Sequence, residues 1–336
     1  MKTRTVVKVA AGHGNLELEE RHLDRPGAGQ VLLRIRRAAI CGTDLHIYRW
    51  NEWAARNYRV PLVLGHEFCG EVLELGPGVT GLREGQRVSG ETHIFCGTCD
   101  QCRSNRRHTC SRLQLFSKSG YGCFCDYTIV PANALRIVPD HLSLNEAAVL
   151  EPLGVGIRAA TAAGISGKSL LVTGCGPIGL YTIAAARALG ACEIFAADLS
   201  PRRLDMARQV GADMSVDVAG MENGTVDAVI DATGNASLIE AALSVIRPGG
   251  TMLLVGLPER PLALQAGHVI NREIAVKGIY GRLIDETWLS AERLLAAGRL
   301  PIDRIETCEF PVTQFKDAFE CALSGTTGKV IFNLDA

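Results

Sequence analysis

The sequence predicts an α/β protein of two domains, one rich in β-strands and one built on a doubly wound parallel sheet. Its 336 residues exceed the usual size of a single hydrophobic core. Short β-rich runs punctuated by Gly and Pro fill residues 4–150, whereas strands and helices alternate over 153–285. A glycine-rich turn joins a strand to a helix near the start of that alternating part.

The expected elements follow in chain order. VLLRIRRAAI and FCGEVLEL are the clearest strands of the β-rich part. The alternating part offers the strands SLLVT, EIFAA, VDAVID, TMLLVGL and IAVKG, with helices over 177–189 and 201–210. Further helices are expected over 286–298 and 313–324, before a closing strand, KVIFNL. Alternation of this kind is typical of a parallel sheet.

The glycine-rich turn has the spacing of a dinucleotide-binding fingerprint. The strand LLVT runs directly into it and an apolar helix follows; the six residues are Gly174, Cys175, Gly176, Pro177, Ile178 and Gly179. Glycines there permit a tight turn and close approach of a pyrophosphate to the helix N-terminus. Asp198 ends the next strand, where a carboxylate accepts hydrogen bonds from both ribose hydroxyls and repels a 2′-phosphate.

NAD+ is therefore the expected cofactor. Arg202 and Arg203 keep an alternative open, because either arginine can stack on the adenine or receive the phosphate of NADP+.

Four cysteines form a C-x2-C-x2-C-x7-C cluster, namely Cys96, Cys99, Cys102 and Cys110. Four thiolates suit a tetrahedral zinc ion with no open coordination position. An iron–sulfur cluster and a nucleic-acid-binding zinc ribbon both require other spacings. The cluster therefore predicts a structural zinc site, with buried cysteines that bind no metal as the alternative.

A second metal site is suggested by Cys41 in CGTDLH, His66 in GHEFCG and Glu151 in LEPLG. A zinc ion that does chemistry keeps few protein ligands and leaves a position for water or substrate. Each of the three residues alone also has an ordinary structural explanation, as a small buried thiol, a turn histidine or a helix-start carboxylate. Their joint occurrence with the cysteine cluster and the glycine turn favours a catalytic metal.

Charge and composition narrow the partners. With 35 Lys+Arg against 36 Asp+Glu, the chain has no basic surface of the kind that binds nucleic acid or an acidic membrane. Early charges, including Lys2 and Arg4, leave no apolar run for a signal peptide. Twelve cysteines are then better explained as metal ligands and core residues of a cytoplasmic protein than as disulfides. A small-molecule substrate is expected.

The order CGTD, GHE, four-cysteine loop, EPL and GxGxxG resembles the medium-chain, zinc-dependent alcohol dehydrogenase superfamily over essentially the whole chain. CGTDLHIYRWNEWA, SGETHIFCGTCDQCR, KGIYGRLIDETW and SGTTGKVIF resemble most closely the L-threonine 3-dehydrogenases within it. The resemblance implies a GroES-like catalytic domain (residues 1–152 and 297–336) and a Rossmann domain (153–296). It also implies two zinc ions per chain, NAD+ and a homo-oligomer, either a tetramer or a dimer.

The resemblance further implies roles for individual residues. Cys41, His66 and Glu151 match the catalytic zinc positions, and Glu67 matches a carboxylate that can exchange onto the metal. Thr43 and His46 match a proton relay to solvent, and His93 matches a residue near the substrate.

The substrate itself is left open by one departure. After EPLG the chain continues Val155-Gly156-Ile157-Arg158, which is closer to polyol dehydrogenases than to threonine dehydrogenases. Oxidation of a β-hydroxy-α-amino acid such as L-threonine is therefore weighed against two alternatives. One is a dehydrogenase of polyols or of amino-sugar alcohols such as aminocyclitols, and the other is a non-catalytic NAD-binding regulatory protein.

Overall fold

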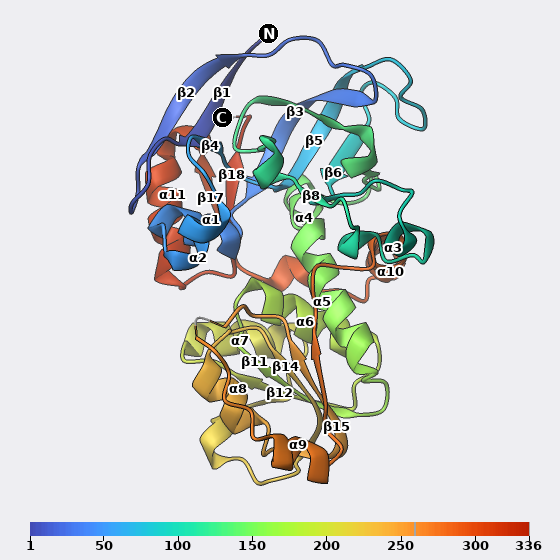
Figure 1. Ribbon diagram of the computed structural model, residues 1–336, viewed down its shortest axis with the longest axis vertical. Coiled ribbons are helices and arrows are strands. Elements are labelled where there is room, and N and C mark those ends of the chain that lie inside the picture. Colours follow the sequence, from blue (N-terminus) through green and yellow to red (C-terminus); the bar gives the residue numbers. More distant parts are fainter. Residues whose placement is uncertain (259, 336) are drawn as a thin grey trace. The chain divides into compact units, whose positions relative to one another are not determined.

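A computed structural model describes residues 1–258 and 260–335. The chain forms two compact units (Figure 1). The first unit contains Met1–Glu151 and Thr307–Ala336, and the second contains Pro152–Glu306. The first unit is thus assembled from both ends of the chain.

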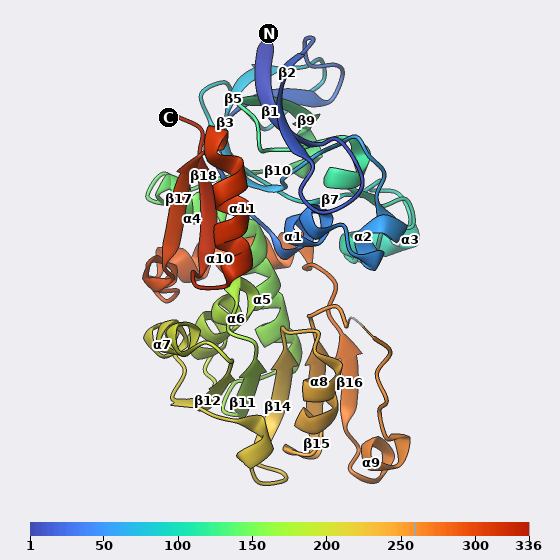
Figure 2. The same cartoon turned by 90° about the vertical axis from the view of Figure 1, so that its left-hand side faces the viewer.

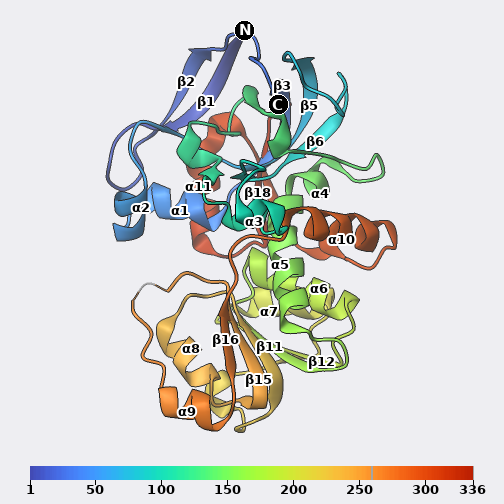
Figure 3. The ribbon, with the colours of Figure 1, turned by 45° about the vertical axis from the view of Figure 1, so that its right-hand side comes forward.

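The first unit is built around a mostly antiparallel sheet with the strand order β10-β6-β5-β3-β18-β17, and β9 also pairs with β3 (Figure 1). A smaller sheet has the order β2-β1-β4 (Figure 1), and its strands β1 and β2 lie side by side (Figure 3). A third, two-stranded sheet pairs β7 with β8. The strands are β1 Lys2–Lys8, β2 Leu16–His22, β3 Gln30–Ala39, β4 Leu62–Val63, β5 Glu67–Leu75, β6 Arg87–Gly90, β7 His93–Ile94, β8 Gln114–Leu115, β9 Tyr127–Pro131, β10 Leu135–Ile137, β17 Thr307–Pro311 and β18 Lys329–Asn333.

The C-terminal helix α11 (Phe315–Ser324) completes the core of the first unit. It lies over β17 and β18 (Figure 2). Its buried residues Phe315, Ala318 and Phe319 follow the spacing of one helical face. The ring of Phe319 lies 6.2 Å from that of Phe124, which in turn lies 4.8 Å from Phe332 on β18. Aromatic packing therefore joins the C-terminal segment to the N-terminal half.

The β-rich half also contains short helices that hydrophobic periodicity did not reveal. They are α1 Gly42–Arg49, α2 Glu52–Asn57, α3 Asp100–Arg103 and α4 Leu144–Ala148. Their sequence signals are capping residues: Asn51 accepts a hydrogen bond from Ala54 N–H at 3.0 Å, and Ser143 accepts one from Glu146 N–H at 3.2 Å. Helices of this length bury too few residues to show a 3.6-residue period.

The second unit is the predicted parallel sheet, with the order β13-β12-β11-β14-β15-β16 (Figure 2). Every pairing within it is parallel. Strand order reverses between β11 and β14, the switch point of a doubly wound sheet, where such folds bind ligands. The strands are β11 Ser169–Thr173, β12 Glu193–Ala197, β13 Met214–Ser215, β14 Val226–Asp231, β15 Ile246–Leu254 and β16 Ala275–Gly278.

The helices connecting these strands agree closely with the expected ranges. The helix expected over 201–210 is α7, and the one expected over 177–189 is α6, which ends one residue earlier. The helix expected over 286–298 begins at Ile284, because Asp285 and Glu286 stabilise its first turn. The helices are α5 Leu150–Ala163, α6 Pro177–Ala188, α7 Pro201–Val210, α8 Ala236–Ala242, α9 Ala266–Asn271 and α10 Ile284–Ala296. Among the described residues, no helix has the length and apolarity needed to cross a membrane.

The three glycines of the turn between β11 and α6 have different surroundings. Gly174 has a φ of +86°, which favours glycine, and a Cβ there would lie 2.7 Å from Thr233 Cγ2. A Cβ on Gly179 would overlap the carbonyl oxygen of Gly174. A Cβ on Gly176 would meet only Arg203 Nη1, at 4.0 Å. Gly174 and Gly179 therefore serve the turn itself, whereas Gly176 keeps space open above it.

This difference predicts opposite outcomes for two alanine substitutions. Gly179→Ala should lower the free energy of unfolding by about 1–3 kcal/mol, because its methyl group overlaps backbone that cannot move. Gly176→Ala should change it by less than about 0.5 kcal/mol. Chemical denaturation monitored by circular dichroism measures both, and equal destabilisation by the two variants would contradict this account of the turn.

Candidate active site and metal centres

The topology of the first unit brings distant parts of the chain to one end of the central sheet. Strand β3 lies between β5 and β18, and Ala39 at its end pairs with both Glu67 and Ile331. Cys41 lies two residues after the end of β3, Glu67 begins β5, and Lys329 begins β18. These three side chains therefore meet although they are far apart in the sequence.

Asp44 ties two of the site-bearing loops together. Cys41 is the N-cap residue of α1, and its N–H donates to Asp44 Oδ2 at 3.0 Å. Asp44 occupies the third helical position, where a carboxylate commonly reaches back to the N-cap. Its Oδ1 accepts a hydrogen bond from Gly65 N–H at 3.3 Å. Asp44 is fully buried, so it fixes the loop before α1 against the loop that carries His66.

The structure brings Cys41, His66 and Glu67 together as a group able to hold a metal ion. One ligand atom from each lies within 4.8 Å of the others. A thiolate, an imidazole and a carboxylate are a suitable ligand set for zinc. Glu67 Oε1 is buried and has no hydrogen-bond partner among the described residues, which is costly unless a cation binds it. The residues present thus fit a zinc ion.

Negative charge accumulates around this group. Burial alone would lower the pKa of His66, but the charges of Cys41, Asp44 and Glu151 raise it to about 10. Burial raises the pKa of Glu67, which the charge of Lys329 opposes. Lys329 is itself buried, with Nζ 2.5 Å from Glu67 Oε2. Lys329 and the protonated ring of His66 both face these buried anionic groups, and a divalent cation that binds the ring takes the place of its proton.

Glu151 lies close to this group but is not one of its three members. It stands at the start of α5 and is buried. Its Oε1 accepts a hydrogen bond from Thr92 Oγ1 at 2.9 Å. Its charge acts on both His66 and Glu67. Two carboxylates, Glu67 and Glu151, therefore stand beside the Cys41–His66 pair, held by different partners.

The ring of His66 is oriented through Nδ1. Ser117 Oγ lies 3.4 Å from this nitrogen, and Asp44 Oδ1 lies 3.9 Å from it. Polar groups on one ring nitrogen set the tautomer and turn the other nitrogen toward a metal. Nε2 would therefore be the ligand atom for a zinc ion bound here.

Thr43 and His46 lie one helical turn apart on α1, and both are partly exposed. Asn51 determines which nitrogen of the neutral His46 ring carries the proton. Because Asn51 Oδ1 accepts from Ala54 N–H, its Nδ2 faces His46 Nδ1, at 2.8 Å. An amide nitrogen can only donate, so neutral His46 carries its proton on Nε2.

His93 begins β7 and is buried beside Glu91. Its Nδ1 lies 2.9 Å from Glu91 Oε1 and 3.2 Å from Thr92 Oγ1. Because Thr92 also contacts Glu151, hydrogen bonds connect His93 to the metal-binding region.

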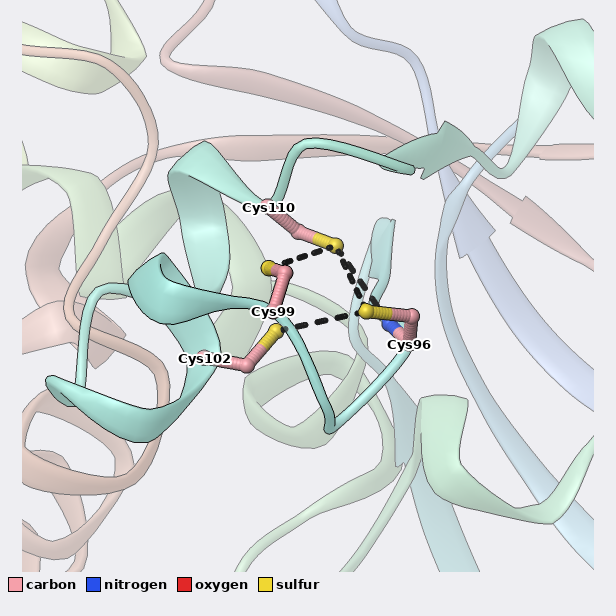
Figure 4. Close-up of side chains that lie close together, drawn as sticks. All are labelled: Cys96, Cys99, Cys102 and Cys110. Carbon is pink, nitrogen blue, oxygen red and sulfur yellow. Dashed lines mark hydrogen bonds between the residues drawn. The ribbon is translucent and has the colours of Figure 1, made fainter.

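The four predicted structural ligands form one cluster (Figure 4). The Sγ–Sγ distances are 3.9 Å for Cys96–Cys102, 3.7 Å for Cys99–Cys110 and 3.5 Å for Cys96–Cys110. Sulfurs bound tetrahedrally to one zinc ion at about 2.3 Å lie about 3.8 Å apart. None of the four sulfurs is in a disulfide. The spacing of the sulfurs fits a zinc ion at their centre.

Hydrogen bonds prepare two of these thiols to lose their protons. A hydrogen bond from the Thr98 backbone N–H lowers the pKa of Cys96 to about 5. A hydrogen bond from the Cys102 backbone N–H lowers the pKa of Cys99 to about 7. Burial raises the pKa of Cys102 to about 12. Thiolates in such close contact repel one another, and zinc removes that repulsion.

The cofactor residues lie where β11 and β12 end. Asp198 Oδ2 accepts a hydrogen bond from Cys175 N–H at 2.7 Å, and Oδ1 accepts one from Ser200 N–H at 2.8 Å. Pro177 opens α6 and Gly176 is its N-cap, without a side chain to occupy the helix N-terminus. Ile178 follows in the first turn. Arg203 Nη1 lies 3.9 Å from Asp198 Oδ2.

Five residues of the site escaped the sequence analysis, namely Asp44, Asn51, Glu91, Thr92 and Lys329. Local patterns could have indicated Asp44 and Asn51, because both occupy helix-capping positions. Glu91 contacts His93 two residues away, in a pattern that has no recognised sequence signal. Thr92 and Lys329 depend on contacts between distant segments, for which the sequence carries no short-range signal.

Comparison with known proteins agrees with this arrangement. Residues 27–140 match the alcohol dehydrogenase GroES-like domain, and residues 177–297 match the zinc-binding dehydrogenase family. The L-threonine 3-dehydrogenase of Coxiella burnetii is 39% identical over 344 residues, covering 99% of both chains.

Two solved structures show the same fold. The L-idonate 5-dehydrogenase of Escherichia coli is 29% identical, with a TM-score of 0.88 and 99% of both chains covered. A zinc-binding dehydrogenase from Sinorhizobium meliloti bound to NADP is 26% identical, with the same TM-score and coverage. The predicted GroES-like and Rossmann fold class is thereby confirmed, and the chain belongs to the zinc-dependent alcohol dehydrogenase family.

Proposed function

We propose that this enzyme oxidises the secondary alcohol of a β-hydroxy-α-amino acid, with L-threonine as the first candidate. The product is a ketone, and a hydride passes to NAD+. The convergence of Cys41, His66 and a carboxylate supports the reaction class most directly. The L-threonine 3-dehydrogenase relative at 39% identity supports the substrate class.

The catalytic metal site is proposed to use Cys41 and His66 with Glu151 or Glu67 as the carboxylate ligand. Zinc bound there supplies Lewis-acid chemistry, which lowers the pKa of an alcohol. Asp44 holds the loops that carry Cys41 and His66, and Lys329 offsets part of the charge of Glu67. The four-cysteine cluster is proposed to hold the second zinc ion as a structural site.

Thr43 and His46 are proposed to carry the proton of the alcohol to solvent. Both are partly exposed on α1, which begins at the loop of Cys41. Asn51 fixes the neutral His46 ring with its proton on Nε2, and the Asn51 amide must give up Nδ1 when the ring takes a proton from Thr43. His93 is proposed to lie beside the substrate, where Glu91 fixes its ring.

Polyols and amino-sugar alcohols remain the second candidate substrates, because the L-idonate 5-dehydrogenase is 29% identical. The Val155–Arg158 segment supports them less than its residues first suggest. A Cβ on Gly156 would lie 2.6 Å from Tyr181 C and 2.7 Å from Thr182 N, so close packing of α5 on α6 requires glycine there. Ile157 is buried. Two residues of this segment thus serve packing rather than substrate choice.

NAD+ is proposed as the preferred dinucleotide. Backbone hydrogen bonds hold Asp198 at the strand end, where its charge repels a 2′-phosphate. Arg203 favours NADP+ instead. Its Nε is buried without a hydrogen-bond partner among the described residues, and an arginine donor of this kind can bind a 2′-phosphate. The relative bound to NADP keeps the second dinucleotide in the test.

The chain is proposed to be a homo-oligomer, either a tetramer or a dimer, that pairs through β16. This edge strand is exposed at all four positions. Val276 on this strand is exposed, and Lys277 next to it is a charge of the kind that opposes strand pairing. The unpaired backbone N–H and C=O groups of an exposed edge strand can nevertheless bond to the same strand of another copy.

A cytoplasmic location is proposed because none of the twelve cysteines forms a disulfide, which suits a reducing compartment. Recovery of the chain mainly outside the cytoplasm on cell fractionation would argue against it.

A substrate panel tests the proposed activity. The zinc-loaded protein should reduce NAD+ fastest with L-threonine or another β-hydroxy-α-amino acid, and more slowly with polyols and aminocyclitols. Reduction of the dinucleotide is followed at 340 nm, with NAD+ and NADP+ run in parallel. Activity only with polyols would replace the amino-acid proposal with the second candidate. Faster reaction with NADP+ would overturn the proposed role of Asp198.

Replacement of His46 tests the proton relay. His46→Ala should lower kcat about 100-fold near neutral pH, the usual contribution of general acid–base catalysis, while the Kd for NAD+ stays constant. His22→Ala, on exposed β2, is the matched control and should leave kcat unchanged. A His46→Ala enzyme with the turnover and pH profile of the parent would exclude the relay.

A charge on the exposed edge strand tests the proposed oligomer. Val276→Lys should shift the sedimenting species to a smaller assembly, because it removes the apolar side chain of this strand and adds a second charge beside Lys277. Ile137→Lys places the same charge on β10 of the first unit, and should leave the assembly intact. An unmodified protein that sediments as a 36.0 kDa monomer would refute the proposal.

A further inference from the structure

Three consecutive buried residues after β6 lead by hydrogen bonds to Glu151. Glu91 Oε1 accepts from His93 N–H at 3.0 Å and lies 2.9 Å from His93 Nδ1. Thr92 Oγ1 lies 3.2 Å from His93 Nδ1 and donates to Glu151 Oε1 at 2.9 Å. All four side chains are buried. The proposed reaction assigns no role to Glu91 or Thr92 beyond their contacts with His93 and Glu151.

The direction of each hydrogen bond follows from the number of protons. A hydroxyl has one proton, and a carboxylate only accepts, so the Thr92 proton goes to Glu151. Thr92 Oγ1 must then accept from His93 Nδ1–H, which Glu91 Oε1 also accepts. The chain therefore runs from His93 through Thr92 to Glu151, and Glu91 fixes the ring from the other side.

The two carboxylates of the metal site are held in different ways. Thr92 binds Glu151 by a directional hydrogen bond from a neutral group. Glu67 faces the buried ammonium group of Lys329, and its Oε1 has no hydrogen bond among the described residues. A hydroxyl fixes the orientation of a carboxylate, whereas a point charge mainly balances its charge.

We propose that Thr92 is a positioning residue that holds Glu151 for the catalytic metal, and that Glu91, through His93, holds the Thr92 hydroxyl in place. This inference rests on the proposed metal site at Cys41 and His66. Partners that orient a ligand in this way typically change metal affinity 10- to 100-fold when removed. In this account Thr92 favours Glu151 over Glu67 as the carboxylate ligand.

Metal release to a chromogenic chelator tests the proposal without measuring activity. The zinc-loaded parent should lose its zinc in two phases, a faster one from the catalytic site and a slower one from the four cysteines. Thr92→Val keeps the shape of the side chain and removes the hydroxyl, so the faster phase should accelerate about 10- to 100-fold. The four-cysteine phase should not change, and it serves as a control within the same molecule.

Three further variants sharpen the test. Thr92→Ser retains the hydroxyl and should release zinc at the parent rate. Thr5→Val is the matched control, because Thr5 Oγ1 is buried with no hydrogen-bond partner among the described residues. Glu91→Gln should accelerate the faster phase as well, because the amide retains the shape and loses the charge that holds His93. Glu91→Gln also replaces Thr92→Val if the latter fails to fold.

The outcomes separate this inference from the function on which it rests. If the parent holds one zinc ion per chain, the same number as its Cys41→Ala variant, the proposed catalytic site is overturned. A parent with two phases whose faster phase is unchanged in Thr92→Val, or in Glu91→Gln, would overturn the positioning role alone. If Thr5→Val accelerates zinc release equally, the effect of Thr92→Val is a non-specific loss of stability, and the positioning role is overturned.

Discussion

Buried negative charge with too few protein cations is the constraint on which the first compact unit depends. Glu67, Asp44 and Glu151 are all buried beside Cys41 and His66, and Lys329 is the buried lysine that offsets part of their charge. Burying unpaired carboxylates opposes folding strongly. A divalent metal relieves that cost, and the metal's own positive charge then acts on whatever oxygen binds next to it. The same charge balance thus serves stability and chemistry.

The strand order of the first unit determines where these buried charges meet. Because β3 pairs with both β5 and β18, residues from both ends of the chain converge on one end of the sheet. In the second unit, Gly174 and Gly179 are needed for the turn between β11 and α6. Gly176 leaves space open at the N-terminus of α6. In both units the site lies where strands end, and the sheets behind it supply rigidity.

The sequence predicted those parts of the molecule whose signal is local. The four-cysteine spacing indicated the cluster that Figure 4 shows, and the strand–turn–helix around Gly174 indicated the nucleotide fold. It did not indicate that Lys329 faces Glu67 or that Thr92 holds Glu151, because those contacts join segments far apart in the chain. It also missed the short helices α1 and α2, which are recognisable by their caps and not by periodicity. Cys41 and His66 became convincing as a site only through the order of motifs.

Anomalous X-ray scattering at the zinc edge, from crystals of the zinc-loaded chain, locates the bound metal ions. Two zinc peaks per chain are expected. One lies at the centre of the four cysteines, and the other is bound by Cys41 Sγ, His66 Nε2 and an oxygen of Glu151 or Glu67. A single peak at the four cysteines, or a second peak bound by neither carboxylate, would contradict this expectation.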